Sequence, residues 1–188
     1  LGTAGEPAGE GVFVERNRLM SAPEDRTAFA TALVERLLGE RGWDVLSLDG
    51  MHPDDAEALY AVHSDPRVMR YWSFPAWTDP AQARAKIATV LDERARGAVY
   101  AWVVADTASD RLIGSVAAFA LDRVHRRAEI GYSLHADWQG RGLAQEALRA
   151  VLAFLIDEAG FERIEADIDP RNAASCRLAE RVGFVREG

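Results

Sequence analysis

The sequence has few of the residues that covalent cross-links and membrane spans require. Cys176 is the single cysteine among 188 residues, so no internal disulfide can form, as is typical of proteins in a reducing cytoplasm. No run approaches the ~18 uninterrupted apolar residues of a membrane span, and we expect no signal peptide before the fold. These absences predict a cytoplasmic domain without a membrane anchor.

Basic residues are also outnumbered, which bears on the partners of the protein. The chain carries 22 Lys and Arg against 30 Asp and Glu, a formal net charge of −8. An acidic surface disfavours non-specific binding to nucleic acid and favours cationic substrates, although acidity alone also serves solubility. With 48% hydrophobic and 28% charged residues, the composition is that of one globular domain.

Hydrophobic periodicity, together with the glycine and proline residues that end helices and strands, divides the chain into three parts. Residues 1–20 are predicted to be a flexible tail or an added segment, although 12–19 alternate like a short strand. Residues 21–42 predict an additional N-terminal helix, and residues 43–188 predict the main domain. The last strand of that domain is expected to be incomplete.

Within the main domain, alternating runs and helical stripes succeed one another. A helix is also expected to begin at Pro53, and residues 68–77 predict a loop. Strands are expected over 43–48, 99–106, 111–121, 126–135 and 163–169, and helices over 80–96, 142–159 and 172–182. We therefore expect a mixed, mainly antiparallel α/β sheet of six to seven strands with helices on both faces.

The segment 135–147, HADWQGRGLAQEA, joins the fourth of these strands to the longest helix. Two glycines at a helix N-terminus suggest that a ligand approaches the backbone closely there, where the N–H groups can bind an anion. Gln145 stands where the dinucleotide fingerprint requires glycine, and no Walker A motif occurs. From the motif alone, a phosphate-binding turn and an ordinary strand-to-helix turn are equally good interpretations.

Several motifs in the same order and spacing resemble the GNAT acetyltransferase superfamily. They lie in AEIGYSLHADWQGRGLAQEAL and GFERIEADIDPRNAASCRLAERVGFVREG, and the resemblance is greatest with the branch of ribosomal-protein N-terminal and spermidine acetyltransferases. It is clearest over 111–188 and extends back to Trp43. It implies that the glycine turn holds the pyrophosphate of acetyl-CoA, which serves as the co-substrate.

The resemblance also implies roles for individual residues. Glu129 matches the carboxylate proposed as general base, and Ser175 matches the hydroxyl proposed as general acid. Ala179 departs from the pattern, because many members of the superfamily have a tyrosine there that protonates the thiolate. The expected cofactor-binding residues are Tyr132, Leu134, Gln139, Gly140, Arg141, Gly142, Leu143, Ala144 and Asn172.

The acceptor is less well defined than the cofactor. Trp72, Phe74 and Trp77 could line an amine pocket through cation–π contacts, or could simply cap the core. No metal site is expected, because His125 and His135 lack ligand spacing with another Cys or His. Cys176 is interpreted as a packing residue of its helix.

Three functions remain open at this point. The first is an acetyl-CoA-dependent N-acetyltransferase for a protein N-terminus, a polyamine, an aminoglycoside or a small amine. The second is a transferase for another acyl-CoA, such as succinyl-CoA, and the third is a non-catalytic acyl-CoA sensor. The acidic charge balance and the lack of a long apolar run predict no nucleic-acid or membrane partner. The resemblance suggests a homodimer as one possible assembly.

Overall fold

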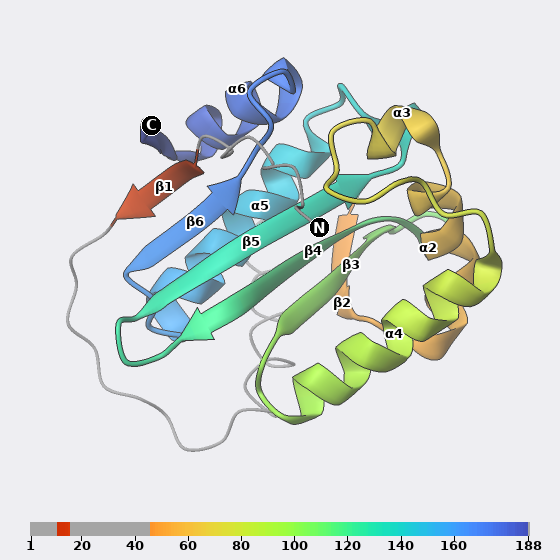
Figure 1. Cartoon of the computed structure of the whole chain (residues 1–188), viewed down its shortest axis with the longest axis horizontal. Helices are drawn as coiled ribbons and strands as arrows, with labels where there is room; N and C mark the ends of the chain where they lie inside the picture. Colours follow the sequence, from red (N-terminus) through yellow and green to blue (C-terminus); the bar gives the residue numbers. More distant parts are fainter. Residues whose placement is uncertain (1–10, 16–45, 188) are drawn as a thin grey trace, which may run out of the picture.

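A computed structural model describes residues 11–15 and 46–187, which form one mixed sheet flanked by helices (Figure 1). The sheet runs in the order β2-β3-β4-β5-β6-β1-β7. Every neighbouring pair is antiparallel except β5 and β6, which are parallel. The strands are β1 (Gly11–Glu15), β2 (Leu46–Gly50), β3 (Tyr100–Asp106), β4 (Arg111–Asp122), β5 (Arg127–Leu134), β6 (Arg163–Asp167) and β7 (Val185–Glu187).

The helices lie on both faces of this sheet (Figure 1). Their bounds are η1 (Pro53–Asp55), α2 (Ala56–His63), α3 (Pro66–Met69), α4 (Pro80–Ala95), η2 (Ala136–Trp138), α5 (Leu143–Ala153), the π-helical η3 (Phe154–Glu158) and α6 (Ala173–Val182). The predicted mixed, mainly antiparallel α/β architecture is therefore confirmed.

The alternation of strand residues separates two hydrophobic clusters. In β3, Trp102 and Val104 face the cluster built around α5 and α6, whereas Ala101 and Val103 face the cluster under α2 and α4. Successive strand side chains point to opposite faces, so one strand contributes to both cores. We call these two sides of the sheet the α5 face and the α2 face.

Several predicted boundaries need correction. The loop expected over 68–77 begins after a short helix, because Asp65 caps α3 by accepting from the backbone N–H of Arg67 and Pro66 is at its first position. The helix expected over 142–159 is α-helical only to Ala153, and π-helical turns follow. The spacing of apolar residues in the sequence does not by itself distinguish an α-helix from π-helical turns.

The N-terminal predictions fall partly outside the described residues. Within the segment expected to be a tail, Gly11–Glu15 forms a strand between β6 and β7 instead. The alternation noted over 12–19 thus corresponds to a strand that begins at Gly11 and is described as far as Glu15, and only the tail prediction is wrong for these residues. The remainder of that tail and the additional helix of residues 21–42 lie outside the described residues.

Candidate active site

The two parallel strands of the sheet separate part-way along their length. In the described part of the chain, β5 pairs with β6 only from Arg127 to Glu129, opposite Arg163 to Glu165. On its other side β5 stays paired with β4 as far as Leu134. Beyond Glu129, one edge of β5 therefore presents backbone groups that an extended ligand can bind.

The glycine turn follows directly after the separated end of β5. Gly140 and Gly142 have φ values of +76° and +84°, in the left-handed region that favours glycine. A Cβ built on either residue meets no heavy atom within 4 Å, so open space lies beside this backbone. The turn therefore has the conformation and the room that close approach of a ligand requires.

The N-terminus of α5 begins at this turn and carries no side-chain cap. Gly142 is its N-cap residue and offers no capping hydrogen bond, whereas Asp79 caps α4 and Asn172 caps α6. The first N–H groups of a helix have no intrahelical acceptor, and the helix dipole favours an anion beside them. The α5 terminus thus combines free donors, open space and a positive partial charge.

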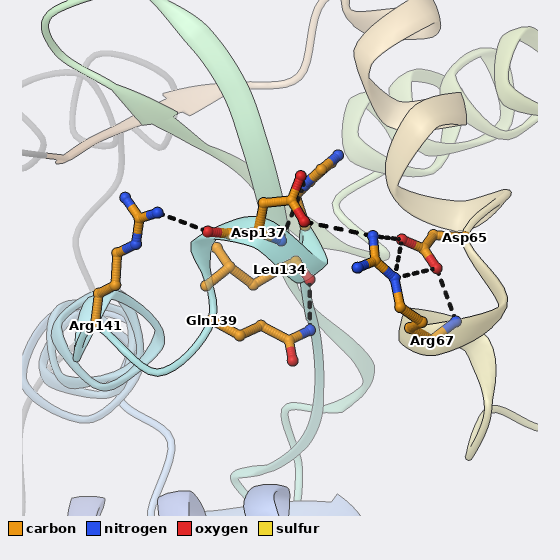
Figure 2. Close-up of polar contacts among 7 residues, drawn as sticks. Asp65, Arg67, Leu134, Asp137, Gln139 and Arg141 are labelled. Atoms are coloured by element: carbon orange, nitrogen blue, oxygen red, sulfur yellow. Dashed lines mark hydrogen bonds and ion pairs between the residues drawn. The ribbon is translucent and has the colours of Figure 1, made fainter.

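Side chains around the turn hold it in place (Figure 2). Gln139 Nε2 donates to the carbonyl oxygen of Leu134 at 2.9 Å, which ties the turn to the last residue of β5. Arg141 Nη2 donates to the carbonyl oxygen of Asp137 at 2.8 Å, and its guanidinium lies 5.0 Å from the ring centroid of Trp138. The exposed Arg141 is therefore a positive charge held beside the turn.

A second cation connects this turn to the segment after α2. Arg67 Nη2 lies 2.6 Å from Asp65 Oδ2 and 3.4 Å from Asp137 Oδ1 (Figure 2). Arg67 comes from α3 and Asp137 from η2, 70 residues apart in sequence. Sequence reasoning missed this bridge, because no local spacing relates two exposed residues on distant elements.

Two of the predicted cofactor-binding residues, at the start of α5, have side chains that pack in the core. Leu143 is buried in the cluster of the α5 face, and Ala144 packs against that cluster. Their side chains are occupied by the core, so only their backbone N–H groups can contribute to anion binding. At these two positions we therefore predict contacts to the cofactor from the main chain alone.

Asn172, Ser175 and Tyr132 meet near the start of α6. Asn172 Oδ1 accepts from the backbone N–H of Ser175 at 3.2 Å, so this oxygen serves the helix cap. Tyr132 reaches from β5, and its hydroxyl donates to the carbonyl oxygen of Ser175 at 3.5 Å. Burial raises the pKa of Tyr132, which keeps its phenol protonated.

Glu129 lies where β5 and β6 separate, on the α2 face. Ala128 and Ile130 on either side of it belong to the core of the α5 face, so Glu129 points to the opposite side. Burial raises the pKa of Glu129, as do the carboxylates of Asp167 and Glu165, while Arg127 lowers it. A carboxyl group with a raised pKa is a better proton acceptor near neutral pH than an ordinary glutamate.

The structure puts the two predicted catalytic residues on opposite faces of the sheet. Ser175 is joined through Tyr132 to the α5 face, and Glu129 is on the α2 face. An acceptor arriving from one side and a thiol leaving on the other would each find a polar group.

The predicted aromatic residues gather around a histidine that the sequence analysis did not select. His63, at the end of α2, stacks on Trp77 with 4.5 Å between ring centroids and meets Trp72 edge-on at 5.6 Å. Phe74 continues the cluster at 5.3 Å from Trp72. Trp77 also packs against the α2-face core, so these residues share the sheet face of Glu129.

Burial lowers the pKa of His63, so its imidazole is neutral at physiological pH. Its Nδ1 lies 3.2 Å from the carbonyl oxygen of Leu59, which assigns the proton to that nitrogen. The signal available in the sequence was the position of His63 on the inward face of its helix, which alone does not distinguish a core residue from a pocket residue.

Residues 11–15 and 46–187 contain neither a metal-binding cluster nor a membrane-spanning helix. No group of three or more His, Cys, Asp or Glu side chains there could hold a metal ion. No helix in the same residues has the length and apolar character to cross a membrane.

Comparison with known proteins agrees with this geometry. The model of the acetyltransferase (GNAT) domain matches residues 46–185. The chain belongs to the GNAT acetyltransferase family. It is 32% identical to the "Uncharacterized N-acetyltransferase p20" of Bacillus licheniformis over 155 residues, covering 82% of this chain and 85% of that protein.

Other GNAT proteins share both sequence and fold with the chain. The "Uncharacterized N-acetyltransferase YoaA" of Bacillus subtilis is 34% identical, over 77% of this chain and 82% of that protein. The crystal structure of a GNAT acetyltransferase from Bacillus anthracis superposes with a TM-score of 0.68 and 26% identity, covering 77% of this chain and 82% of that one. This GNAT protein is therefore an acyltransferase of the N-acetyltransferase type.

One position of this GNAT chain departs from a pattern common in the superfamily. Ala179, where many members have tyrosine, is buried in the core of the α5 face. No hydroxyl is available from that position, so a proton for the leaving group must come from another residue or from water.

Proposed function

We propose that the protein transfers the acetyl group of acetyl-CoA to a primary amine. The observation that carries the proposal is the separation of β5 from β6 beyond Glu129, with the uncapped N-terminus of α5 at the end of the separated strand. This arrangement supplies an extended backbone edge and an anion-binding terminus in series, which suits a long thioester cofactor with a pyrophosphate group.

The cofactor contacts are assigned accordingly. The backbone of Tyr132 and Leu134 would bind the pantetheine arm. Gln139, Gly140, Arg141, Gly142, Leu143 and Ala144 would surround the pyrophosphate, the last two through N–H groups only. Asn172 would contribute its amide NH2 group, because its carbonyl oxygen caps α6. Solved GNAT relatives hold CoA or acetyl-CoA, among them a ribosomal L7/L12 acetyltransferase with coenzyme A.

The chemistry needs one base and one acid. The amine nitrogen forms a bond to the acetyl carbon, the carbon–sulfur bond breaks, and the sulfur leaves as a thiolate. Glu129 takes the proton of the amine, and Ser175 or water returns a proton to sulfur. Backbone N–H groups near the separated strands stabilise the oxyanion that develops on the carbonyl oxygen.

The acceptor is assigned to the α2 face, which carries Glu129 and the aromatic cluster of Trp72, Phe74 and Trp77. Related enzymes bear names that specify spermidine or ribosomal proteins as acceptors. Both acceptors present an ammonium group, as a site containing a carboxylate and aromatic rings requires.

Calorimetric titration tests the cofactor assignment first. Acetyl-CoA and CoA should bind with micromolar affinity, whereas ATP and NAD should not. Thiol release with a panel of primary amines then tests transfer. Absence of acetyl-CoA binding by the folded protein would refute the proposal, and tight binding without turnover on any amine would identify a sensor instead.

A further inference from the structure

Phe119 is a large apolar side chain in an exposed position near the end of β4. Its relative exposure is 37%, whereas Val116 and Ala118 just before it are buried. Ala117, two residues earlier, packs against the α2-face core, so Phe119 also points to the α2 face. No ring–ring or cation–ring contact found among the described residues involves Phe119.

The backbone immediately after Phe119 is distorted. The pairing of β4 with β5 shifts register between Phe119 and Asp122, which marks a β-bulge. Ala120 within this bulge has φ +49°, a conformation that residues with a Cβ rarely adopt. Bulges commonly redirect a side chain beside a functional site, and this one occurs next to Phe119.

Two residues of β5 define the surroundings of the Phe119 ring. Glu129 is its direct cross-strand partner, so the two side chains stand beside each other on the α2 face. A Cβ added to Gly131 would lie 3.3 Å from Cε1 of Phe119 and 3.9 Å from Cζ. The ring therefore lies over the backbone of Gly131, and a larger residue there would push it away.

The charges on this face favour a cation next to the ring. Glu129 is not the only carboxylate on this face. In β6, Ile164 and Ala166 are buried on the α5 face, so the alternation of the strand puts Glu165 and Asp167 on the α2 face. Two arginines balance part of this charge, because Glu165 Oε1 lies 2.8 Å from Nε of Arg163 and 3.7 Å from Nη1 of Arg127. An aromatic face next to a carboxylate is the combination that binds an alkylammonium group.

We propose that Phe119 is a specificity-determining residue for the acceptor. Its ring forms the wall beside Glu129 against which the acceptor ammonium and its adjoining methylene group lie. The acceptor class is a primary aliphatic amine that arrives as a cation and transfers its proton to Glu129. This inference rests on the proposed function and goes beyond it by assigning the contact that recognises the charge.

Acetyl transfer to two acceptors of equal length tests this contact. One is n-butylamine, which is cationic at neutral pH, and the other is an O-alkylhydroxylamine, which is uncharged there. Phe119→Leu keeps apolar volume but removes the aromatic face, and Phe119→Tyr keeps that face. Val124→Ala, at an exposed apolar residue of the hairpin after β4, is the control.

We expect Phe119→Leu to raise KM for n-butylamine about tenfold, the factor that a partly desolvated cation–π contact provides. KM for the uncharged acceptor and the Kd for acetyl-CoA should stay within about twofold of wild type. Phe119→Tyr and Val124→Ala should keep wild-type KM values for both acceptors.

Other results would overturn the inference in different ways. Equal losses for both acceptors would mean that the ring contributes shape alone, and no loss for either would remove Phe119 from the site. If the wild-type protein acetylates none of the amines while it binds acetyl-CoA, the proposed function fails and this inference fails with it. Turnover that is insensitive to Phe119→Leu refutes the inference alone.

Discussion

Gly142 and Gly97 share a backbone conformation but occupy different places, which makes them a matched pair. Their φ values are +84° and +69°, and a Cβ on either meets no heavy atom within 4 Å. Gly142 precedes α5 at the proposed pyrophosphate turn, whereas Gly97 follows α4. Substitution at either residue therefore has the same conformational cost, and only one substitution should affect the cofactor.

We predict that Gly142→Val abolishes CoA binding, because the side chain fills the space that the pyrophosphate would occupy. Gly97→Val should lose a similar stability, about 1–2 kcal/mol for a residue with a Cβ in the left-handed region, and keep wild-type affinity. Calorimetric titration and urea unfolding measure the two effects. Normal affinity of the Gly142 variant would remove the turn from the cofactor site.

Glu129 is expected to link pH to catalysis. Its raised pKa means that the carboxylate needed as a base is lost as pH falls through a value above the usual 4.5. We predict that Glu129→Gln lowers kcat by about 10²–10⁴-fold and leaves the Kd for acetyl-CoA unchanged. The exposed Glu57→Gln in α2 is the control, and an unaffected kcat would exclude Glu129 as the base.

The same substitution, which lowers activity, should maintain or raise the stability of the fold. A carboxyl group whose pKa is higher in the folded than in the unfolded state destabilises the fold at pH above both values, and this penalty disappears as pH falls below both. Glu129→Gln should therefore unfold at the same temperature as wild type or a higher one at pH 7. A clear decrease in Tm would indicate that the charge of Glu129 stabilises the fold.

At the scale of elements, α4 begins with a complete set of helix-start signals. Asp79 Oδ1 accepts from the backbone N–H of Ala81 at 2.8 Å, and Gln82 Oε1 accepts from the backbone N–H of Asp79 at 3.0 Å. Pro80 is at the first helical position. Sequence patterns of this kind are local, which explains why the expected helix over 80–96 agrees closely with the observed one.

We predict that Asp79→Ala costs about 1 kcal/mol of unfolding free energy through loss of the cap. Asp92→Ala removes an exposed ion pair between α4 and Arg96, the C-cap residue that follows it, and should cost less than about 0.5 kcal/mol. Urea denaturation midpoints of the two variants compare these values. Equal midpoints would show that the cap contributes no more than a surface charge.

Other elements could not be derived locally. The separation of β5 from β6 depends on where two parallel strands, joined through α5, cease to pair, and neither strand differs in pattern at that point. The meeting of His63 with Trp72 and Trp77 requires α2 to fold back against the loop after α3. Long-range packing decides both features.

At the scale of the whole molecule, cofactor binding should stabilise the fold. A ligand that binds only the folded state adds about 2.7 kcal/mol at a concentration of 100 Kd. For a domain of this size we predict a rise in Tm of about 5–10 °C with acetyl-CoA. Differential scanning fluorimetry measures it, with NAD as control and Gly142→Val expected to show no shift.

The sequence by itself determined the mixed α/β class, the strand-to-helix turn with its two glycines, and the family. These features depend on alternation, helical spacing and motifs within a few dozen neighbouring residues, which the chain carries wherever it folds. Only the tertiary structure decided that Glu129 and Ser175 lie on opposite faces, that Arg67 reaches Asp137, and that Phe119 stands beside Glu129. Such contacts depend on strand register, bulges and helix packing, and these arise from the whole set of competing long-range interactions.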